Sequence, residues 1–345
     1  MHVPDGFIDA PTSAVTGVVA AGALAVSLRG ARRELDERTA PLAGLVAAFI
    51  FAVQMLNFPV AAGTSGHLLG GALAAILVGP CTGVLCVSVV LLMQGILFAD
   101  GGLTALGVNV TDMAIVTTVV SYAVFRGLVK ALPRGRRSIT VASFVAALVS
   151  VPAAAVAFTL IYAVGGTTDV AISKVATAMI GVHVLIGIGE AVITSLTVGA
   201  VVAVRPDLVY GARGLQQRLK LRVDGELVDA PATPVPAAAR TSRRGLWITG
   251  LVTSLVLAGF VSFYASANPD GLEKVAHDKG IDKKTGRHAS SDSPLAGYGV
   301  KDISDARLSG GLAGVIGVGF TVVFGSTVFW VVARRRRAVE PAEAA

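Results

Sequence analysis

Apolar residues along the chain gather into nine segments with polar or basic stretches between most of them, and the third and fourth segments share one continuous run. Runs of about 17–25 apolar residues match a bilayer core of about 30 Å, and lipid satisfies backbone polar groups only when such a run is helical. The strand alternation of an outer-membrane barrel is absent, so the pattern predicts an all-α, polytopic helical membrane protein. The predicted segments are 13–28, 42–60, 68–79, 81–98, 112–131, 139–164, 177–204, 246–266 and 309–333.

Two interruptions divide this pattern into parts. Gly79 and Pro80 separate the third and fourth segments, and we expect a break there because proline cannot continue the hydrogen bonds of a helix. Whether residues 68–98 form one full span or two stays open. Residues 230–239, Ala-Pro-Ala-Thr-Pro-Val-Pro-Ala-Ala-Ala, are typical of a stiff linker. We therefore expect a seven-span bundle at 1–208, a cytoplasmic linker at 209–245 and a two-span unit with an outer loop at 246–345.

Composition and charge support a membrane protein and give its orientation. Hydrophobic residues make up 54% of the chain and charged residues 15%, whereas soluble domains carry about 25% charged residues. With the N-terminus outside and the C-terminus cytoplasmic, 21 of the 29 Lys and Arg residues fall on the cytoplasmic side, as the positive-inside rule requires. The net charge of +7 is thus explained by topology and not by nucleic-acid binding.

Missing motifs exclude several enzyme classes. The chain contains no Gly-Lys-Ser or Gly-Lys-Thr and hence no P-loop, so we expect no ATP hydrolysis by that route. Neither a His-Glu-x-x-His motif nor a Gly-x-Ser-x-Gly elbow occurs. Cys81 and Cys86 lie in apolar sequence and are expected to be packing residues, not metal ligands or disulfide partners.

Two histidines, His2 and His67, are expected on the same outer side of the membrane. We expect Met1 to remain the N-terminus, because no basic region precedes the first apolar run and His2 is too large to favour methionine removal. The α-amine of Met1, the amide nitrogen of His2 and the His2 imidazole can form fused chelate rings, and His67 would complete a square. Square-planar nitrogen coordination suits Ni(II) and Cu(II), whereas zinc prefers a tetrahedron. A merely solvated terminus is the alternative.

Ionisable residues inside a predicted span form a second candidate group. His183 and Glu190 share one helix face in the seventh segment, where charged groups are costly in lipid. They are either functional or a hydrogen-bonded pair that only packs the bundle. His277 and His288 lie in the charged outer loop, where they either hold metal transiently or are simply solvated.

Polar residues near the outer ends of the spans are candidates to orient the ligand imidazoles, with interfacial capping as the equal alternative. They are Gln54, Asn57, Gln94, Asp100, Asn109 and Asp112. At the N-terminus, Pro4-Asp5-Gly6 predicts a turn that would fold the chain end back into the protein, or an ordinary turn before a helix.

Several long stretches in residues 1–208 carry a family resemblance. They are Met1-His-Val-Pro-Asp-Gly-Phe-Ile, Gln54-Met-Leu-Asn-Phe-Pro-Val-Ala-Ala-Gly-Thr-Ser-Gly-His-Leu-Leu-Gly, Asp100-Gly-Gly-Leu-Thr-Ala-Leu-Gly-Val-Asn and Gly187-Ile-Gly-Glu-Ala-Val-Ile-Thr. The chain resembles the CbiM/NikM family, the substrate-binding membrane components of nickel and cobalt energy-coupling-factor importers. Residues 268–274, Asn-Pro-Asp-Gly-Leu-Glu-Lys, look like the signature of the accessory component called NikN or the PDGLE domain.

The resemblance implies a fused transporter subunit and not an enzyme. It implies that Met1, His2 and His67 bind Ni²⁺ or Co²⁺ as transported substrate. The implied partners are a transmembrane coupling (T/Q) subunit and cytoplasmic ATPase (A/O) subunits in the bacterial cytoplasmic membrane. Candidates for a supporting shell or a metal pathway are Asp5, Asn57, Ser65, Asp100, Asn109, His183 and Glu190.

Two other hypotheses stay open. A proton-coupled secondary carrier of divalent metal would use His183 and Glu190 as a proton relay and would need no ATPase. A membrane metal sensor or scaffold would bind metal without transporting it. The sequence does not choose between nickel and cobalt, because both ions accept the same nitrogen ligands; the PDGLE-type accessory only leans toward nickel.

Overall fold

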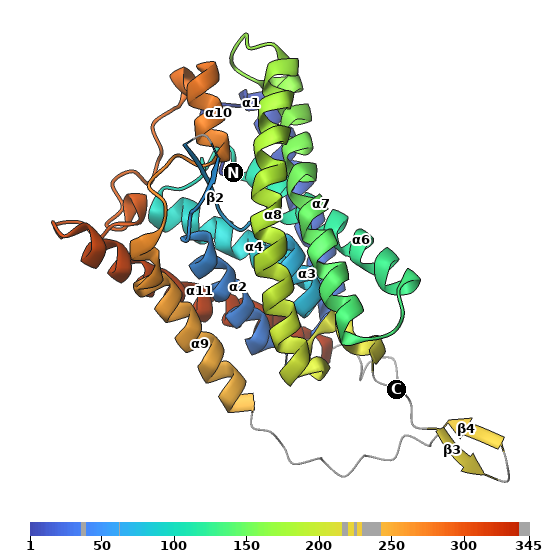
Figure 1. The fold of residues 1–345 in the computed structure, drawn as a ribbon. Helices are drawn as coiled ribbons and strands as arrows, with labels where there is room; N and C mark the ends of the chain where they lie inside the picture. Colours follow the sequence, from blue (N-terminus) through green and yellow to red (C-terminus); the bar gives the residue numbers. More distant parts are fainter. Residues whose placement is uncertain (36–38, 62, 216–219, 224–225, 230–242, 338–345) are drawn as a thin grey trace.

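The computed structural model describes residues 1–35, 39–61, 63–215, 220–223, 226–229 and 243–337, which form a bundle of long helices (Figure 1). Its first part contains α1 (Ala10–Glu34), α2 (Ala40–Gln54), α3 (Gly71–Val78), α4 (Pro80–Met93), α5 (Leu106–Asn109), α6 (Thr117–Ala131), α7 (Arg136–Gly165) and α8 (Ile172–Val204). Residues 243–337, here called the C-terminal segment, contain α9 (Arg243–Gly259), α10 (Gly271–Lys279) and α11 (Ala306–Arg337).

Shorter elements connect these helices. Two antiparallel hairpins form, β1 (Phe58–Ala61) with β2 (Thr64–Gly66) and β3 (Lys220–Val223) with β4 (Glu226–Asp229). Neither hairpin was predicted. Two π-helical segments occur, η1 (Gln94–Phe98) and η2 (Val110–Val116). The 3-10 turns are η3 (Pro206–Leu208), η4 (Tyr210–Leu215), η5 (Val261–Tyr264), η6 (Asp282–Lys284) and η7 (Ala296–Tyr298). The proline-rich residues 230–239 lie outside the described residues.

The all-α membrane fold predicted from the apolar runs is confirmed. Seven of the described helices are long and apolar enough to cross a membrane. The two other predicted segments are shorter, since α2 has 15 residues and α3 has 8, or about 22 and 12 Å at the α-helical rise. The apolar run 42–60 is therefore not one continuous helix: after Gln54 the chain leaves the helix and pairs in the β1–β2 hairpin.

The predicted break at Gly79-Pro80 is present. Helix α3 ends at Val78 and α4 begins at Pro80, and Gly79 has a φ of +105°, a conformation that favours glycine. Glu34, at the end of α1, closes this break, because its carboxylate accepts hydrogen bonds from Cys81 N at 3.1 Å and Thr82 N at 2.7 Å. Both amides belong to the first turn of α4, where backbone donors lack helical partners.

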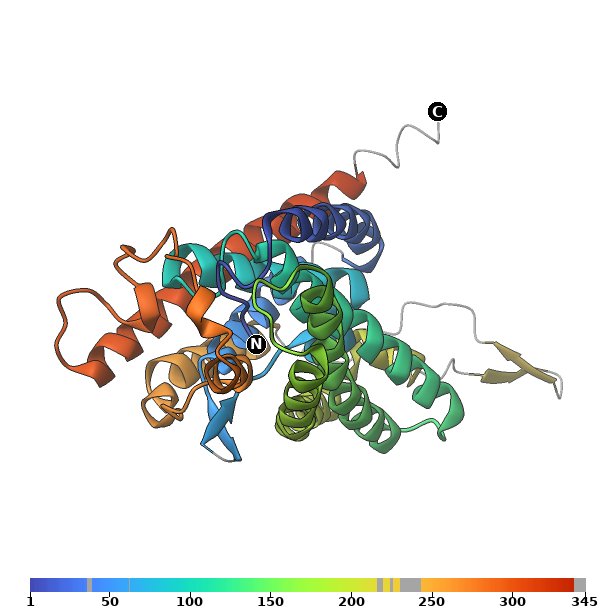
Figure 2. The same cartoon turned by 90° about the horizontal axis from the view of Figure 1, so that it is seen from above.

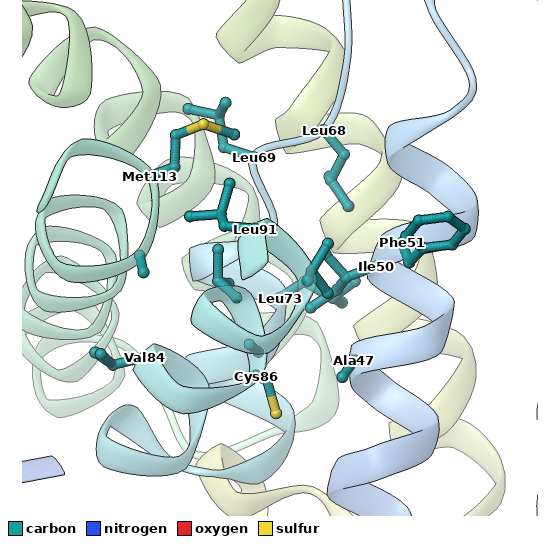
Figure 3. Close-up of a cluster of buried hydrophobic side chains, with 14 of the residues drawn as sticks. Ala47, Ile50, Phe51, Leu68, Leu69, Leu73, Val84, Cys86, Leu91 and Met113 are labelled. Atoms are coloured by element: carbon teal, nitrogen blue, oxygen red, sulfur yellow. The ribbon is translucent and has the colours of Figure 1, made fainter. Parts of the chain in front are cut away.

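The hydrophobic core lies between α2, α3 and α4 (Figure 3). Ile50 of α2, Leu73 of α3 and Leu91 of α4 are each nearly or fully buried there. Cys86 is also fully buried, and both cysteines are free. Helix α11 packs against α2 so closely that a Cβ at Gly44 would lie 2.7 Å from Ser326 N. The C-terminal segment is therefore packed into the first part of the molecule.

One end of the bundle holds the start of the chain. The N-terminus lies beside α10 and the β1–β2 hairpin in Figure 1, and Figure 2 shows it surrounded by helices when that end is viewed from above. The opposite end carries the last turn of α8 and the first turn of α9. Residues from the start, the middle and the C-terminal segment of the sequence thus meet at one end of the bundle.

Candidate metal centre

Residues 1–9, here called the N-terminal arm, are folded into this end of the bundle. Val3 is fully buried and His2 is 9% exposed. The backbone of Val3 is held by Asn109, which accepts from Val3 N at 2.7 Å and donates to Val3 O at 3.1 Å. Gly102 N donates to the same carbonyl at 2.8 Å. Asn109 thus pairs with the arm as a neighbouring strand would, directly before the π-helical η2, and π-helical turns occur frequently at functional sites.

The predicted turn at Pro4-Asp5-Gly6 forms and folds the arm inward. Asp5 Oδ1 accepts from Thr104 N at 2.8 Å and from Thr104 Oγ1 at 2.5 Å. Gly6 has a φ of +90°, and a Cβ there would lie 2.2 Å from Lys284 O, so the position excludes a side chain. Asp5 therefore anchors the arm to the loop before α5, while Gly6 lets the C-terminal segment approach.

Three nitrogen-bearing groups converge at the end of the arm. The Met1 nitrogen lies 2.6 Å from His67 Nε2. The imidazoles of His2 and His67 stack with ring centroids 5.2 Å apart and an interplanar angle of 24°. One ligand atom each from His2, His67 and Asp270 lies within 4.8 Å of the others. The structure therefore brings together Met1, His2 and His67, as the sequence analysis expected, and adds a carboxylate.

Hydrogen bonds fix which imidazole nitrogen faces the cluster. His67 Nδ1 donates to Leu68 O at 3.0 Å, which leaves the lone pair on Nε2, the atom beside the Met1 nitrogen. His2 Nε2 donates to Gln94 Oε1 at 3.0 Å, which leaves the lone pair on Nδ1. Nδ1 is the nitrogen that closes a chelate ring with the His2 amide. Partners of this kind orient metal-binding histidines in proteins.

Asp270, in the C-terminal segment, supplies the charge opposite the chain terminus. Its Oδ2 accepts from the Met1 nitrogen at 2.6 Å and lies 3.5 Å from His67 Nε2. Burial by itself raises the pKa of this carboxyl, but the charged terminus and His67 hold the pKa well below its usual range. Burial also lowers the pKa of His2 to about 4, so His2 is neutral at pH 7 with a lone pair available.

Asp100 and His288 complete the wall beside His2. Asp100 Oδ1 lies 3.4 Å from His2 Nδ1, and its Oδ2 accepts from the Tyr298 hydroxyl at 2.6 Å. His288 accepts from Ser290 N at its Nδ1 and donates from its Nε2 to Gly101 O at 3.1 Å. His288 therefore holds the loop that carries Asp100, instead of being a solvated loop histidine. His277 is exposed on α10.

The loop that carries His67 is tied to the C-terminal segment. Ser65 N donates to Pro269 O at 2.9 Å, and Ser65 Oγ donates to Asn268 O at 2.8 Å. Asn57 contributes its backbone carbonyl, which accepts from Ser266 N at 2.7 Å. Between these segments lies a cavity of about 520 Å³, lined by polar and aromatic residues that include His2, His67, Asp100, Asp270 and Tyr298. The cluster thus opens into a space that a small hydrated ion can enter.

His183 and Glu190 are both buried in α8, but they bond to different partners. Glu190 accepts from Leu69 N at 2.6 Å and Gly70 N at 3.0 Å, just before α3. His183 donates from Nδ1 to Met179 O at 2.7 Å, and its Nε2 has no hydrogen-bond partner among the residues that the structure describes. His183 lies near the cluster, because a Cβ at Gly271 would be 3.2 Å from its ring.

Two other polar candidates lie in the core instead of in the cluster. Gln54 Nε2 donates to Leu69 O at 3.0 Å, although the Gln54 side chain also borders the cavity. Asp112 is fully buried, and neither of its carboxylate oxygens has a hydrogen-bond partner in the described part of the chain.

Sequence reasoning missed Asp270 and Tyr298 as members of the cluster. Asp270 is part of the Asn268–Lys274 signature, but no spacing along the chain connects it with Met1. A local signal was present, since Asp270 and Glu273 form the pattern of a helix-capping box. That pattern predicts the start of α10 and gives no hint that the second carboxylate oxygen faces another part of the chain.

Comparisons with known proteins show what the chain is similar to. A family profile described as "Cobalt uptake substrate-specific transmembrane region" matches residues 2–208, and one described as "PDGLE domain" matches residues 244–334. A putative metal transport protein of Haloquadratum walsbyi is 38% identical over 210 residues, which cover 61% of this chain and 94% of the relative.

Two further relatives are themselves named as fused proteins. A putative fused nickel transport protein NikMN of Archaeoglobus fulgidus is 39% identical over 61% of this chain and 68% of its own length. The fused nickel transport protein NikMN of Rhodobacter capsulatus is 44% identical over 36% of each chain. A crystal structure of a truncated transition metal transporter is 28% identical, with a TM-score of 0.52 over 59% of this chain and 99% of that one.

Proposed function

Because the chain belongs to the family described as the cobalt uptake substrate-specific transmembrane region, we propose that it captures Ni²⁺ or Co²⁺ for an ATP-driven energy-coupling-factor importer. Relatives named for nickel transport and for cobalt transport support both ions as transported substrates. The chain is a transporter membrane protein and not an enzyme.

The observation that carries the proposal is the convergence of Met1, His2 and His67. Their amine and two imidazoles offer three neutral nitrogen donors once the amine loses its proton, and the His2 amide nitrogen is the fourth. Four nitrogens in one plane favour Ni(II), and imidazole and amine donors also accept Co(II). Asp5 and Asn109 serve to hold the arm, while Asn57, Ser65 and Asp100 serve to hold the loops around the ligands.

ATP coupling is the part of the proposal that requires other proteins. The sequence contains no P-loop, so a cytoplasmic ATPase (A/O) and a transmembrane coupling (T/Q) subunit would supply the energy. The positive-inside distribution supports a cytoplasmic membrane location with the metal centre outside. We place the two units at 1–208 and 246–345, joined by a cytoplasmic linker at 209–245.

The carrier hypothesis has weaker support. It requires proton exchange between His183 and Glu190, yet Glu190 is held by two backbone amides and His183 by Met179 O. No hydrogen bond between the two appears among the described residues. The unpaired Nε2 of His183 fits a pathway role better, as a nitrogen that an ion leaving the cluster would meet.

Calorimetric titration of the purified full chain with Ni²⁺ and Co²⁺ in parallel tests metal capture. We expect tight binding of at least one ion, loss of binding in His2→Ala and His67→Ala, and parent affinity in the matched control His277→Ala. A chain with one residue added before Met1 is expected to bind much more weakly than the parent and to keep only a residual affinity, because its amine is displaced. Equal heats from the parent and His67→Ala would refute the proposed centre.

Reconstitution tests the coupling. Vesicles that contain the chain together with the coupling and ATPase subunits should accumulate metal only with ATP. Uptake by the chain alone that collapses on addition of an uncoupler would establish the carrier instead. Binding without any uptake when all partners are present would leave a sensor or scaffold.

A further inference from the structure

The carboxylate of Asp270 serves two elements at once. Its Oδ1 accepts from Glu273 N at 2.8 Å, while Glu273 Oε2 accepts from Asp270 N at 2.9 Å, so this end of the carboxylate caps α10. Its Oδ2 accepts from the Met1 nitrogen at 2.6 Å. The helix cap therefore fixes the direction in which the second oxygen points.

Surrounding contacts hold Asp270 at this position. The carbonyls of the two preceding residues, Asn268 and Pro269, accept from Ser65 in β2. The next residue, Gly271, packs so closely on α8 that a Cβ would lie 2.8 Å from the Ile186 side chain. Asp270 is thus tied on one side to the loop that carries His67 and on the other to α8, and the Asp270 side chain is 11% exposed.

The positive charge at the chain terminus explains why position 270 carries a carboxylate. Without metal, the buried ammonium of Met1 is a single positive charge, and a buried charge is costly unless it is paired. With metal, a divalent ion bound to one ionised amide and three neutral nitrogens also leaves one net positive charge. The negative charge of Asp270 balances the single net positive charge of the centre both with and without metal. Met1 and both histidines carry no negative charge of their own.

We propose that Asp270 is a positioning residue of the metal centre: it accepts a hydrogen bond from the metal-bound Met1 amine and neutralises the captured divalent cation. A coordinated primary amine keeps two N–H bonds, so the Met1 nitrogen, which donates to Asp270 at 2.6 Å here, would still have a proton to donate once its lone pair binds metal. The inference rests on the proposed function. If Asp270 has this role, residues of both the first 67 positions and the C-terminal segment form the metal centre.

Two substitutions separate this role from the helix cap. Asp270→Asn removes the charge and keeps the shape, and Asp270→Ser keeps a good N-cap but cannot reach Met1; both residue types cap helices well. We expect each to weaken Ni²⁺ binding about 10–100-fold, the usual cost of losing a partner of a metal ligand. Asp282→Asn, an exposed acid in the same loop, is the matched control and should bind as the parent does.

A double-mutant cycle tests whether Asp270 acts through the amine. In a chain with one residue added before Met1 the amine is displaced, so Asp270→Asn should have no further effect on residual Ni²⁺ affinity. An effect of equal size in both backgrounds would mean that the charge acts only at long range, and would overturn the positioning role.

The absorption spectrum and magnetic state of bound Ni(II) distinguish an Asp270 that accepts a hydrogen bond from the Met1 amine from an Asp270 that binds the metal directly. Four nitrogens in a plane give diamagnetic Ni(II), and we expect this in the parent and in Asp270→Asn alike. Paramagnetic Ni(II) that becomes diamagnetic in Asp270→Asn would make Asp270 a fifth ligand and refute the outer role. Unchanged affinity in both Asp270 variants refutes the inference alone, whereas a parent chain that binds no metal refutes the proposed function.

Discussion

Replacing Asn109 with leucine should release the N-terminal arm while preserving the core volume. Val3 O would keep its bond from Gly102 N, but Val3 N would lose its partner in a fully buried position. An orphaned buried N–H costs about 1–3 kcal/mol, and the second lost bond about 1 kcal/mol. The equilibrium constant for docking of the arm would then fall about 30- to 1,000-fold, because each 1.4 kcal/mol changes it by a factor of about ten.

Metal affinity reports on this loss. Met1 and His2 belong to the arm, so only molecules with a docked arm bind metal well. The apparent dissociation constant for Ni²⁺ therefore rises by the reciprocal of the docked fraction. The change of about 30- to 1,000-fold in docking is thus an upper limit for the loss of Ni²⁺ affinity. Competition titration with a Ni²⁺ chelator measures the effect, and acylation of the terminal amine without metal measures exposure. Thr111→Val is the matched control, because the Thr111 hydroxyl donates to Gly107 O, within its own helical segment, and not to the arm. Parent affinity together with an equally protected amine in Asn109→Leu would refute this account of the arm.

Three further substitutions have distinct expected outcomes. Gly102→Ala places a Cβ 2.3 Å from Asp5 N; we expect weak metal binding with intact helices, checked by titration and circular dichroism. Tyr298→Phe removes the hydroxyl that donates to Asp100 at 2.6 Å and should weaken Ni²⁺ binding about 5- to 30-fold, the equivalent of 1–2 kcal/mol. Glu34→Gln should lower the free energy of unfolding by about 1–2 kcal/mol, measured by thermal unfolding, because it caps α4 less well. It should leave the Ni²⁺ affinity measured by titration unchanged, because Glu34 lies at the far end of α1 from the arm.

The long helices were predictable because a helix that crosses a lipid bilayer needs a long, nearly uninterrupted run of apolar residues, which is visible in the sequence. Segments such as 139–164 and 177–204 fall inside α7 and α8, which are long and apolar enough to cross a membrane. The run 42–60 misled the prediction because hydropathy measures burial and not helicity. Phe58, Val60 and their neighbours are apolar, yet they form one strand of a hairpin that packs against α8.

The candidate centre was predictable in part. The position of His2 beside the terminal amine is a local chemical fact, so Met1 and His2 could be paired from the sequence. His67 could be added because the predicted topology puts it on the same side of the membrane as His2. Asp270 could not, because 269 positions separate it from Met1 and tertiary packing, such as that of α11 on α2 and α10 on α8, brings the C-terminal segment to this end. Contacts between distant segments leave no periodic signal.

The sequence Pro-Asp-Gly occurs at residues 4–6, where it forms a turn, and at residues 269–271, where it begins α10, and both copies show how such distant segments hold each other. In the arm, Gly6 lets Lys284 approach and Asp5 O accepts from Gly286 N at 2.7 Å. In the C-terminal segment, Gly271 lies on α8 and Asp270 accepts from Met1. Each segment therefore supplies contacts that the other needs, so a change that loosens one should loosen both. It follows that Asn109→Leu, which acts on the arm alone, should also increase hydrogen exchange in α10, and unchanged exchange there would show that the C-terminal segment docks independently.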